Sequence, residues 1–174
     1  MAVSLGPEGL ILDNTTMPHD TPGLIVKTEV IQSPSSADNF SVSANTNVIW
    51  WSHTFTTLQA NSRILINYHS GQINAYTSAA NFNALLEWSV DSTNRGSGMA
   101  IYREHNHEWY QFGGSEVDKR FFITGTALSN TLSAGSHTIR AWAGTYNADL
   151  IFAHQGNSGG GLRRPAFVIQ ELTT

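Results

Sequence analysis

The chain contains no cysteine and few charged residues. Without cysteine among its 174 residues, neither a disulfide framework nor a thiolate metal site can hold the fold, so packing or oligomerisation must do so. Asp, Glu, Lys and Arg make up only 13% of the chain, whereas Ser, Thr, Asn and Gly are abundant. Solubility therefore depends on hydroxyl and amide groups, a composition that suits repeated protein contacts and also suits secreted lectins.

The sequence also lacks a basic field and long apolar runs. The formal net charge is -4, and the basic residues are scattered apart from Arg163 and Arg164, which argues against nucleic-acid binding. No stretch approaches the roughly 18 to 20 apolar residues of a membrane span, and the N-terminus lacks a basic segment followed by an apolar one, so we expect no membrane association. No internal repeat is visible, which disfavours a long β-helical spike.

Short alternating patterns, interrupted by turn residues, predict one all-β domain from residue 23 to residue 174. About ten strand candidates occur, more than enough for an eight-stranded jelly roll. In three of these candidates, the residues on one face of the strand are expected to lie in the core. These residues are Leu24, Val26 and Val30; Ile49, Trp51, His53 and Phe55; and Ile64, Ile66 and Tyr68. A strand from Ile73 is expected to return from the third candidate as a hairpin.

The tryptophans supply both core and surface candidates. Trp88 alternates with Leu86 and Val90, which predicts a core position. Adjacent Trp50 and Trp51 must face opposite sides of a regular strand, so one is expected in the core and the other at the surface or at a subunit interface. Flat indole rings can also stack on sugars, and the candidates for exposed recognition aromatics are Trp109 and Tyr110.

Residues Met1 to Pro22 are expected to form an extended N-terminal arm. Gly6, Gly9 and three prolines interrupt this stretch and disfavour a regular element. A frayed terminus is the simple interpretation. The functional interpretation is an anchor, in which the apolar triplet Leu10, Ile11 and Leu12 is buried against another subunit or a capsid protein.

The sequence carries one weak metal candidate and no catalytic constellation. His105 and His107 are two residues apart, which on a strand would place both imidazoles on one face, but no third ligand is fixed and a solvated loop is the stronger alternative. The remaining histidines and acidic residues have no spacing that assembles a nucleophile, a base and an orienting acid, or a glycosidase carboxylate pair. We therefore expect neither an enzyme nor a bound cofactor.

The later segments resemble a known family. The stretch SAGSHTIRAWAGTY, in which Ile139, Ala141 and Ala143 share one strand face, is followed by the apolar LRRPAFVIQEL and preceded by the alternating ALLEWSVD with its turn DSTNRGSG. Together these segments are similar to the later strands of TNF/C1q-like jelly rolls found in tailed-bacteriophage virion proteins. The resemblance covers about Leu24 to Leu172 and implies an all-β jelly-roll β-sandwich that associates as a homotrimer.

This resemblance implies a phage virion structural protein. The most direct expectation is a capsid decoration or cement protein, made in the host cytoplasm, that binds the major capsid protein or another virion protein on the outer surface of the capsid. The alternative is a tail-fibre or receptor-binding module that recognises host-surface glycans through Trp109, Tyr110 and nearby loops. A hydrolase is the least supported class.

Overall fold

In the computed structural model, every regular element that is described is a β-strand. The structure describes residues 3–6, 9–12, 15–16, 23–32, 40–77, 81–101, 105–110, 117–152 and 165–174, and it describes side chains for 23–31, 40–75, 82–101, 120–152 and 165–174. Within these ranges no helix is long and apolar enough to cross a membrane. The sequence prediction of an all-β fold is confirmed.

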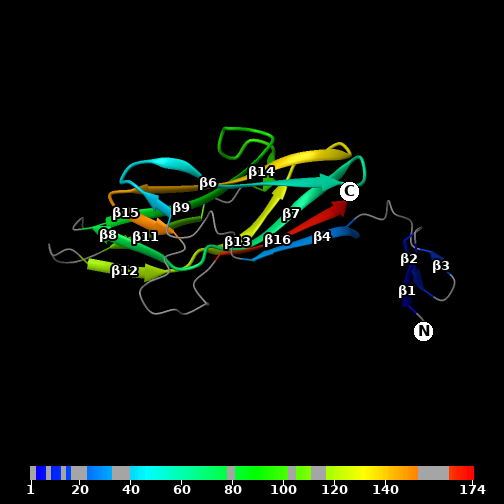
Figure 1. The fold of residues 1–174 in the computed structure, drawn as a ribbon, viewed down its shortest axis with the longest axis horizontal. Coiled ribbons are helices and arrows are strands. Elements are labelled where there is room, and N and C mark those ends of the chain that lie inside the picture. Colours follow the sequence, from blue (N-terminus) through cyan, green and yellow to red (C-terminus); the bar gives the residue numbers. More distant parts are fainter. Residues whose placement is uncertain are drawn as a thin grey trace.

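Two antiparallel sheets form the sandwich. One sheet has five strands, which lie in the order β10 (Met99–Ile101), β13 (Thr124–Ser129), β7 (Ser62–His69), β16 (Ala166–Thr173) and β4 (Ile25–Gln32). The other has four strands, in the order β11 (His105–Tyr110), β9 (Asn81–Val90), β14 (Gly135–Tyr146) and β6 (Asn47–Thr57). Figure 1 shows the two sheets as superimposed layers along the long axis of the molecule.

The strand order is that of a jelly roll. The principal strands in chain order are β4, β6, β7, β9, β11, β13, β14 and β16. In one sheet, β4 pairs with β16, β16 with β7 and β7 with β13. In the other sheet, β6 pairs with β14, β14 with β9 and β9 with β11. Only one of these pairings, β9 with β11, joins consecutive principal strands, and the other connections cross between the two sheets. The predicted jelly-roll β-sandwich is confirmed.

A third sheet extends the five-stranded layer. Its strands lie in the order β12 (Val117–Phe121), β8 (Ile73–Thr77), β15 (Asp149–Phe152) and β5 (Phe40–Val42). The order matches that of β13, β7, β16 and β4 in the five-stranded sheet. Each strand of the third sheet directly precedes or follows, along the chain, the strand at the same place in the five-stranded sheet. The expected hairpin at Ile73 is therefore wrong: β8 pairs with β12 and β15, not with β7.

Ser70 marks the break between the two halves of this layer. Its buried backbone N–H donates to Ile123 O at 2.9 Å, and its hydroxyl oxygen accepts the Ile123 N–H at 2.9 Å while donating to Gly71 O. A side-chain oxygen thus replaces a ladder carbonyl at the point where β7 ends. The exchange satisfies the buried backbone groups without a continuous ladder.

The core lies between the layers and is rich in aromatic side chains. Trp88 and Phe167 form an edge-to-face pair with ring centroids 5.4 Å apart, and Phe167 also contacts Trp51 at 4.6 Å. The predicted core positions Ile64, Ile66, Tyr68, Leu86, Val90, Ile139, Ala141 and Ala143 are all buried, which confirms the alternation on β7, β9 and β14. Edge-to-face contacts of this kind add to the hydrophobic stabilisation of a core.

Three core predictions on β4 and β6 are wrong. Trp50 and Trp51 are both buried, with 3% and 6% of their surfaces exposed, because the ladder between β14 and β6 shifts register between Ala141 and Trp142 and gives Trp50 the extra position of a bulge. Val30 and Ile49, both predicted for the core, are 60% and 36% exposed. The inward positions of β4 carry Lys27 and Glu29 instead.

Contacts of Lys27 and Glu29 join the β4 and β6 edges of the sandwich. Glu29 Oε2 lies 2.7 Å from His53 Nε2, and Glu29 Oε1 lies 2.7 Å from Lys27 Nζ. Lys27 also donates to Thr56 O and lies 4.4 Å from the centroid of the Phe55 ring. Partial burial raises the pKa of Glu29, but the hydrogen bonds from Lys27 and His53 outweigh it and hold the pKa below its ordinary value.

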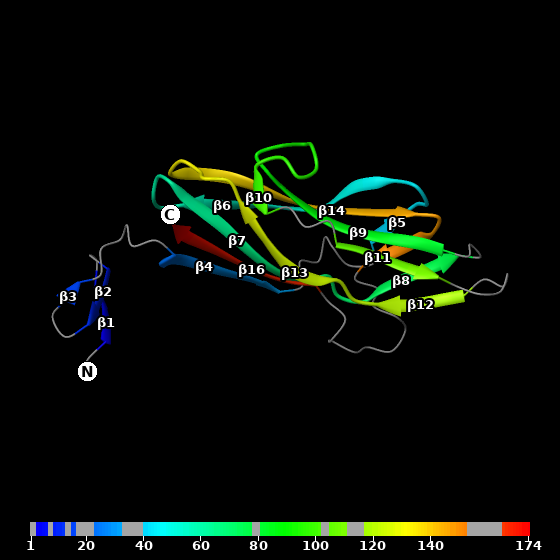
Figure 2. The same ribbon diagram turned by 180° about the vertical axis from the view of Figure 1, so that it is seen from behind.

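Residues 3 to 16 contribute a separate small sheet, in the order β1 (Val3–Gly6), β2 (Gly9–Leu12) and β3 (Thr15–Thr16). The sequence pattern disfavours a regular element here, and that prediction is wrong for these strands. Figures 1 and 2 both show this sheet apart from the sandwich, beyond the end opposite to the third sheet. Leu10 and Leu12 occupy alternate positions of β2, opposite Leu5 and Val3, and Ile11 occupies the position between them.

Candidate assembly surface

The outward side of the five-stranded sheet is a surface of apolar and uncharged polar residues. Along β16 the buried residues Phe167 and Ile169 alternate with half-buried Val168 and Gln170, so the latter two lie on the outward side. The same alternation on β7 places Leu65 and Asn67 outward. Solvated faces of antiparallel sheets are ordinarily polar, so apolar residues at these positions make this side a candidate surface for contact with another protein.

Two rows of cross-strand partners form this surface. One row crosses all five strands through Thr28, Gln170, Leu65, Leu128 and Ile101. The next crosses four strands through Val30, Val168, Asn67 and Thr126. With strands about 4.8 Å apart, the first row extends roughly 20 Å. We call these nine residues the outer rows.

The polar members of the outer rows bind one another. Gln170 Nε2 donates to Thr28 Oγ1 at 3.4 Å, and Thr126 Oγ1 donates to Asn67 Oδ1 at 2.8 Å. Because these groups bond one another, fewer of them would lose a hydrogen bond if a partner displaced water from the rows. The free-energy cost of desolvating the surface is therefore lower. The apolar members Val30 and Ile101 are 60% and 51% exposed and remain available for contact.

Charge is nearly absent from this surface. Among the described outward positions of the five strands, Arg63 carries the only full charge. Lys27 and Glu29, which belong to the same sheet, contact residues of β6 instead. Protein interfaces are depleted of charge at their centres, and a surface with so little charge lets identical copies pack without like-charge repulsion.

The outward side of the four-stranded sheet is different, because residues 91–98 reach back over it. Arg95 Nη1 lies 2.8 Å from Glu87 Oε2, and the Glu87 side chain is almost fully buried. Trp142 Nε1 donates to Ser89 Oγ at 2.9 Å on the same sheet. This side already carries its own covering, so the five-stranded sheet provides the better candidate for contact with another chain.

A His–Asp pair lies at the base of residues 91–98. His137 Nδ1 is 2.7 Å from Asp91 Oδ2, and His137 Nε2 is 2.9 Å from Ser133 O. Both imidazole nitrogens therefore face oxygen acceptors, an arrangement that suits the protonated ring. Burial lowers the pKa of His137, but the hydrogen bonds to Asp91 and Ser133 outweigh it and raise the pKa above its usual value. The pair joins two loops rather than activating a hydroxyl.

The structure brings few of the predicted site residues together. His105 and His107 lie on β11, not in a loop, at register positions opposite Leu86 and Ala84, and Trp109 and Tyr110 lie opposite Phe82 and Asn81. The side chains of these four residues, like those of Leu10, Ile11 and Leu12, lie outside the described part of the chain. In the described ranges no three His, Asp or Glu side chains cluster to hold a metal ion.

Sequence reasoning missed the outer rows. The signal was present, because β4 carries Val26, Thr28 and Val30 at alternate positions and β16 carries Val168 between two core residues. Apolar residues on both sides of a strand indicate that both sides are covered. The sequence alone does not say which of the two sides faces the core.

No family model matches this chain, and no curated protein matches it. Similar solved structures include VP2 of infectious bursal disease virus in a subviral particle, with 14% identity and a TM-score of 0.40 over 99% of this chain and 42% of that one. Latent PorU from Porphyromonas gingivalis is 10% identical, with a TM-score of 0.39 over 88% of this chain and 13% of that one.

A family 16 carbohydrate-binding module is 13% identical, with a TM-score of 0.20 over 71% of this chain and 80% of that one. The chain thus spans less than half the length of the VP2 and PorU chains it matches. Likenesses at this level concern the β-rich fold alone. The functional argument must come from the surfaces of this chain.

Proposed function

We propose that this chain is a non-enzymatic structural protein of a phage virion that assembles as a homotrimer through the outer rows and decorates the outer surface of the capsid. The observation that carries the assembly step is the apolar, nearly uncharged outward side of the five-stranded sheet. The virion role is supported by the resemblance of the closing strands to TNF/C1q-like virion domains. The jelly-roll order of the strands agrees with that resemblance.

A decoration protein stabilises a shell without any chemical reaction. It binds the assembled lattice more tightly than it binds free capsid subunits, so mass action shifts the equilibrium toward intact particles. Three linked copies would engage three lattice sites, and each further contact becomes intramolecular once the first has formed. Weak contacts per copy are then enough for stable attachment.

The N-terminal sheet is the proposed attachment element. It lies apart from the sandwich, so it is free to contact the major capsid protein or another virion protein (Figure 2). Leu10, Ile11 and Leu12 are three consecutive apolar residues in its central strand. Isolated sheets of this size are marginally stable in water, which favours docking against another surface.

Two measurements test the proposal. Sedimentation equilibrium of the purified chain is expected to give three times the 19.0 kDa chain mass, and a monomer at micromolar concentration would contradict the assembly step. Quantitative mass spectrometry of purified virions is expected to find the chain at a copy number comparable to that of the major capsid protein. A trace, tail-like ratio would instead favour the receptor-binding alternative, and absence would overturn the virion role.

A further inference from the structure

A hollow lies on the third sheet, away from the outer rows. Its volume is about 360 Å³, and it is lined by residues of β5, β15 and the turn after β5: Ser41, Val42, Ser43, Asp149, Leu150 and Ile151. Ligand pockets in proteins commonly have volumes of roughly 300 to 1,000 Å³, so this hollow suits a ligand of one small ring. It belongs neither to the assembly surface nor to the His137 pair.

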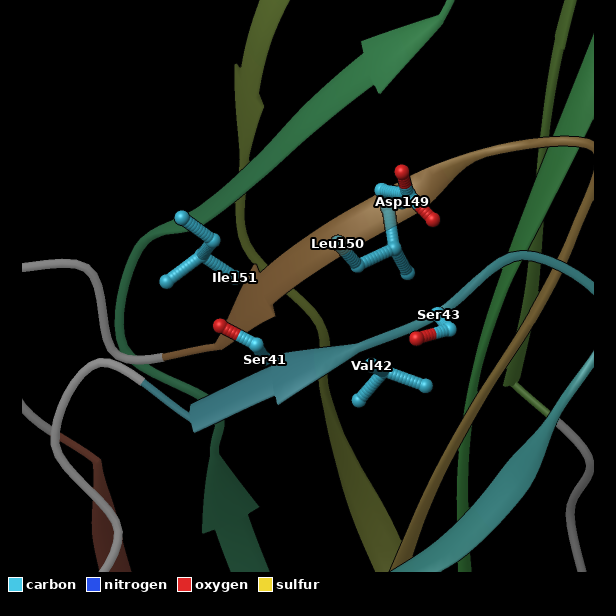
Figure 3. Close-up of a pocket in the computed structure, with 6 residues that line it drawn as sticks. All are labelled: Ser41, Val42, Ser43, Asp149, Leu150 and Ile151. Atoms are coloured by element: carbon cyan, nitrogen blue, oxygen red, sulfur yellow. The ribbon is translucent and has the colours of Figure 1, made fainter.

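The ladder between β5 and β15 fixes the positions of the polar groups. Ser41 is the register partner of Ile151, and Val42 is the partner of Leu150, so the next positions along the ladder place Ser43 opposite Asp149. Figure 3 shows the same grouping, with Ser41 and Ile151 at one end and Ser43 and Asp149 at the other. The hollow therefore presents a hydroxyl at each end and a carboxylate at one end.

The carboxylate of Asp149 is held in place. Its Oδ1 accepts the Ala44 backbone N–H at 2.8 Å, which orients the group over the turn that follows β5. Asp149, Ser41 and Ser43 are all exposed, whereas Val42 and Leu150 are buried beneath them. One oxygen is thus used for positioning, and the exposed carboxylate retains its second oxygen for a ligand.

We propose that this hollow binds one pyranose unit of a neutral glycan. A carboxylate accepts hydrogen bonds from adjacent sugar hydroxyls, and serine hydroxyls donate and accept such bonds. The half-buried side chain of Ile151 provides an apolar contact for a C–H face of the ring. The lining contains no cationic side chain, so a sialic acid, a sulfated sugar or a phosphate is repelled by Asp149.

The lining also disfavours a metal ion. Calcium sites in proteins use about six to eight oxygen ligands with several carboxylates, and this hollow has one carboxylate and two hydroxyls. A single sugar ring in an open site is expected to bind with a dissociation constant of about 1 mM. Display of three such sites on one trimer would raise the avidity for a glycan-coated surface by roughly 10² to 10⁴.

Saturation-transfer difference NMR on the full chain tests this proposal. The probes are methyl α-D-mannopyranoside, methyl β-D-galactopyranoside, methyl β-D-glucopyranoside and N-acetyl-D-glucosamine, with N-acetylneuraminic acid as the anionic comparison. We expect saturable transfer to at least one neutral sugar and none to the acid. Absence of saturable transfer to every neutral sugar, or preferential transfer to the acid, would overturn the proposal.

Matched variants assign any binding to the hollow. Asp149→Asn keeps an oxygen for the Ala44 N–H but loses the charge, and Ser41→Ala leaves the Asp149 contact intact; each is expected to weaken binding about tenfold. Thr54→Ala, at an exposed position of β6 on the other sheet, is expected to bind like the wild type. If Asp149→Asn lowers the melting temperature, Ser41→Ala alone decides. Wild-type affinity in Ser41→Ala and in a folded Asp149→Asn would place the sugar elsewhere and refute the assignment.

Discussion

The imidazole of His137 lies 2.7 Å from the carboxylate of Asp91, across 46 residues of sequence. Asp91 has a positive φ of 53°, and its second oxygen accepts the Thr138 N–H at 2.7 Å. The pair thus holds the loop after β9 against β14, and the other imidazole nitrogen holds the Ser133 carbonyl. Glu171 and Arg140 add charges of opposite sign nearby, and both affect the electrostatics of the pair.

The first prediction concerns pH. The pKa of His137 is raised above its usual 6.5, so its stabilising contribution is full below about pH 6.5 and is lost as the pH rises through the folded-state pKa. Burial raises the pKa of Asp91, but hydrogen bonds from His137 and Thr138 outweigh it and hold the pKa below 3.8. The contribution of Asp91 is therefore present above pH 3.8 and is lost as the pH falls through the folded-state value.

Urea unfolding midpoints measured from about pH 3 to pH 9 check this expectation. The midpoint of the wild type should fall on the alkaline side, and His137→Asn should flatten that limb. Asp91→Asn keeps an acceptor for the Thr138 N–H, removes the charge, and should move the alkaline fall to lower pH. Equal wild-type midpoints at pH 6 and pH 9 would contradict the role of His137.

The second prediction concerns Gly98, where the backbone has φ +76° and a Cβ would lie 2.5 Å from Val90 O. Gly98→Ala is expected to lower the free energy of unfolding by about 2 to 4 kcal/mol, because backbone strain adds to the steric clash. Gly23→Ala is the matched control, since Gly23 has φ +80° but no atom within 4 Å of the added Cβ. Its cost should be only about 1 kcal/mol. Equal losses in the two variants would show that the Val90 contact is unimportant.

The third prediction concerns the outer rows. Val30→Asp places a carboxylate at an exposed position of the proposed assembly surface, where burial against another copy would desolvate it. The trimer dissociation constant is expected to rise at least about tenfold. Thr54→Asp introduces the same charge on the outward side of β6 and should leave assembly unchanged. Sedimentation equilibrium measures both variants, and an unaltered trimer in Val30→Asp would exclude this surface as the interface.

The fourth prediction concerns residues 1 to 22. A chain that lacks Met1 to Pro22 should retain the wild-type melting temperature, because the sandwich strands begin at Ile25 and pair without β1 to β3. Its binding to capsids should be lost, as measured by co-sedimentation with particles stripped of the native protein. Stoichiometric binding of the shortened chain would rule out the N-terminal sheet as the attachment element.

Alternation in the sequence predicted most of the sandwich, because buried strands separated by turns leave a period of two that is readable without a structure. Ile139, Ala141 and Ala143 illustrate this, since all three are fully buried. The pairing of strands was less accessible. Gly71 precedes the strand that begins at Ile73 and is typical of a hairpin turn, yet this strand does not return to β7. The ladder breaks at Ser70, and the new strand pairs with β12 and β15 instead.

Side assignment was the other limit. The sequence does not show that Trp50 and Trp51 lie at a bulge, because the bulge that buries both side chains depends on the register of β6 against β14. Val30 resembles a core residue because both sides of β4 carry apolar side chains. The inward side is identified by contacts across the fold, such as that of Glu29 with His53 on β6. The hollow of Ser41, Ser43 and Asp149 depends on pairing between segments more than 100 residues apart, as the Asp149 contact with Ala44 shows.

The break at Ser70 divides one layer of the jelly roll into two sheets that share no strand pairing. Because the ladder is interrupted there, a shift in the strands that carry Ser41 and Asp149 need not be transmitted to the register of β7, β13 and β16. We therefore expect substitutions around the hollow to leave the spacing of the outer rows unchanged. The proposed sugar site could then change its ligand without altering the proposed association of copies through the outer rows.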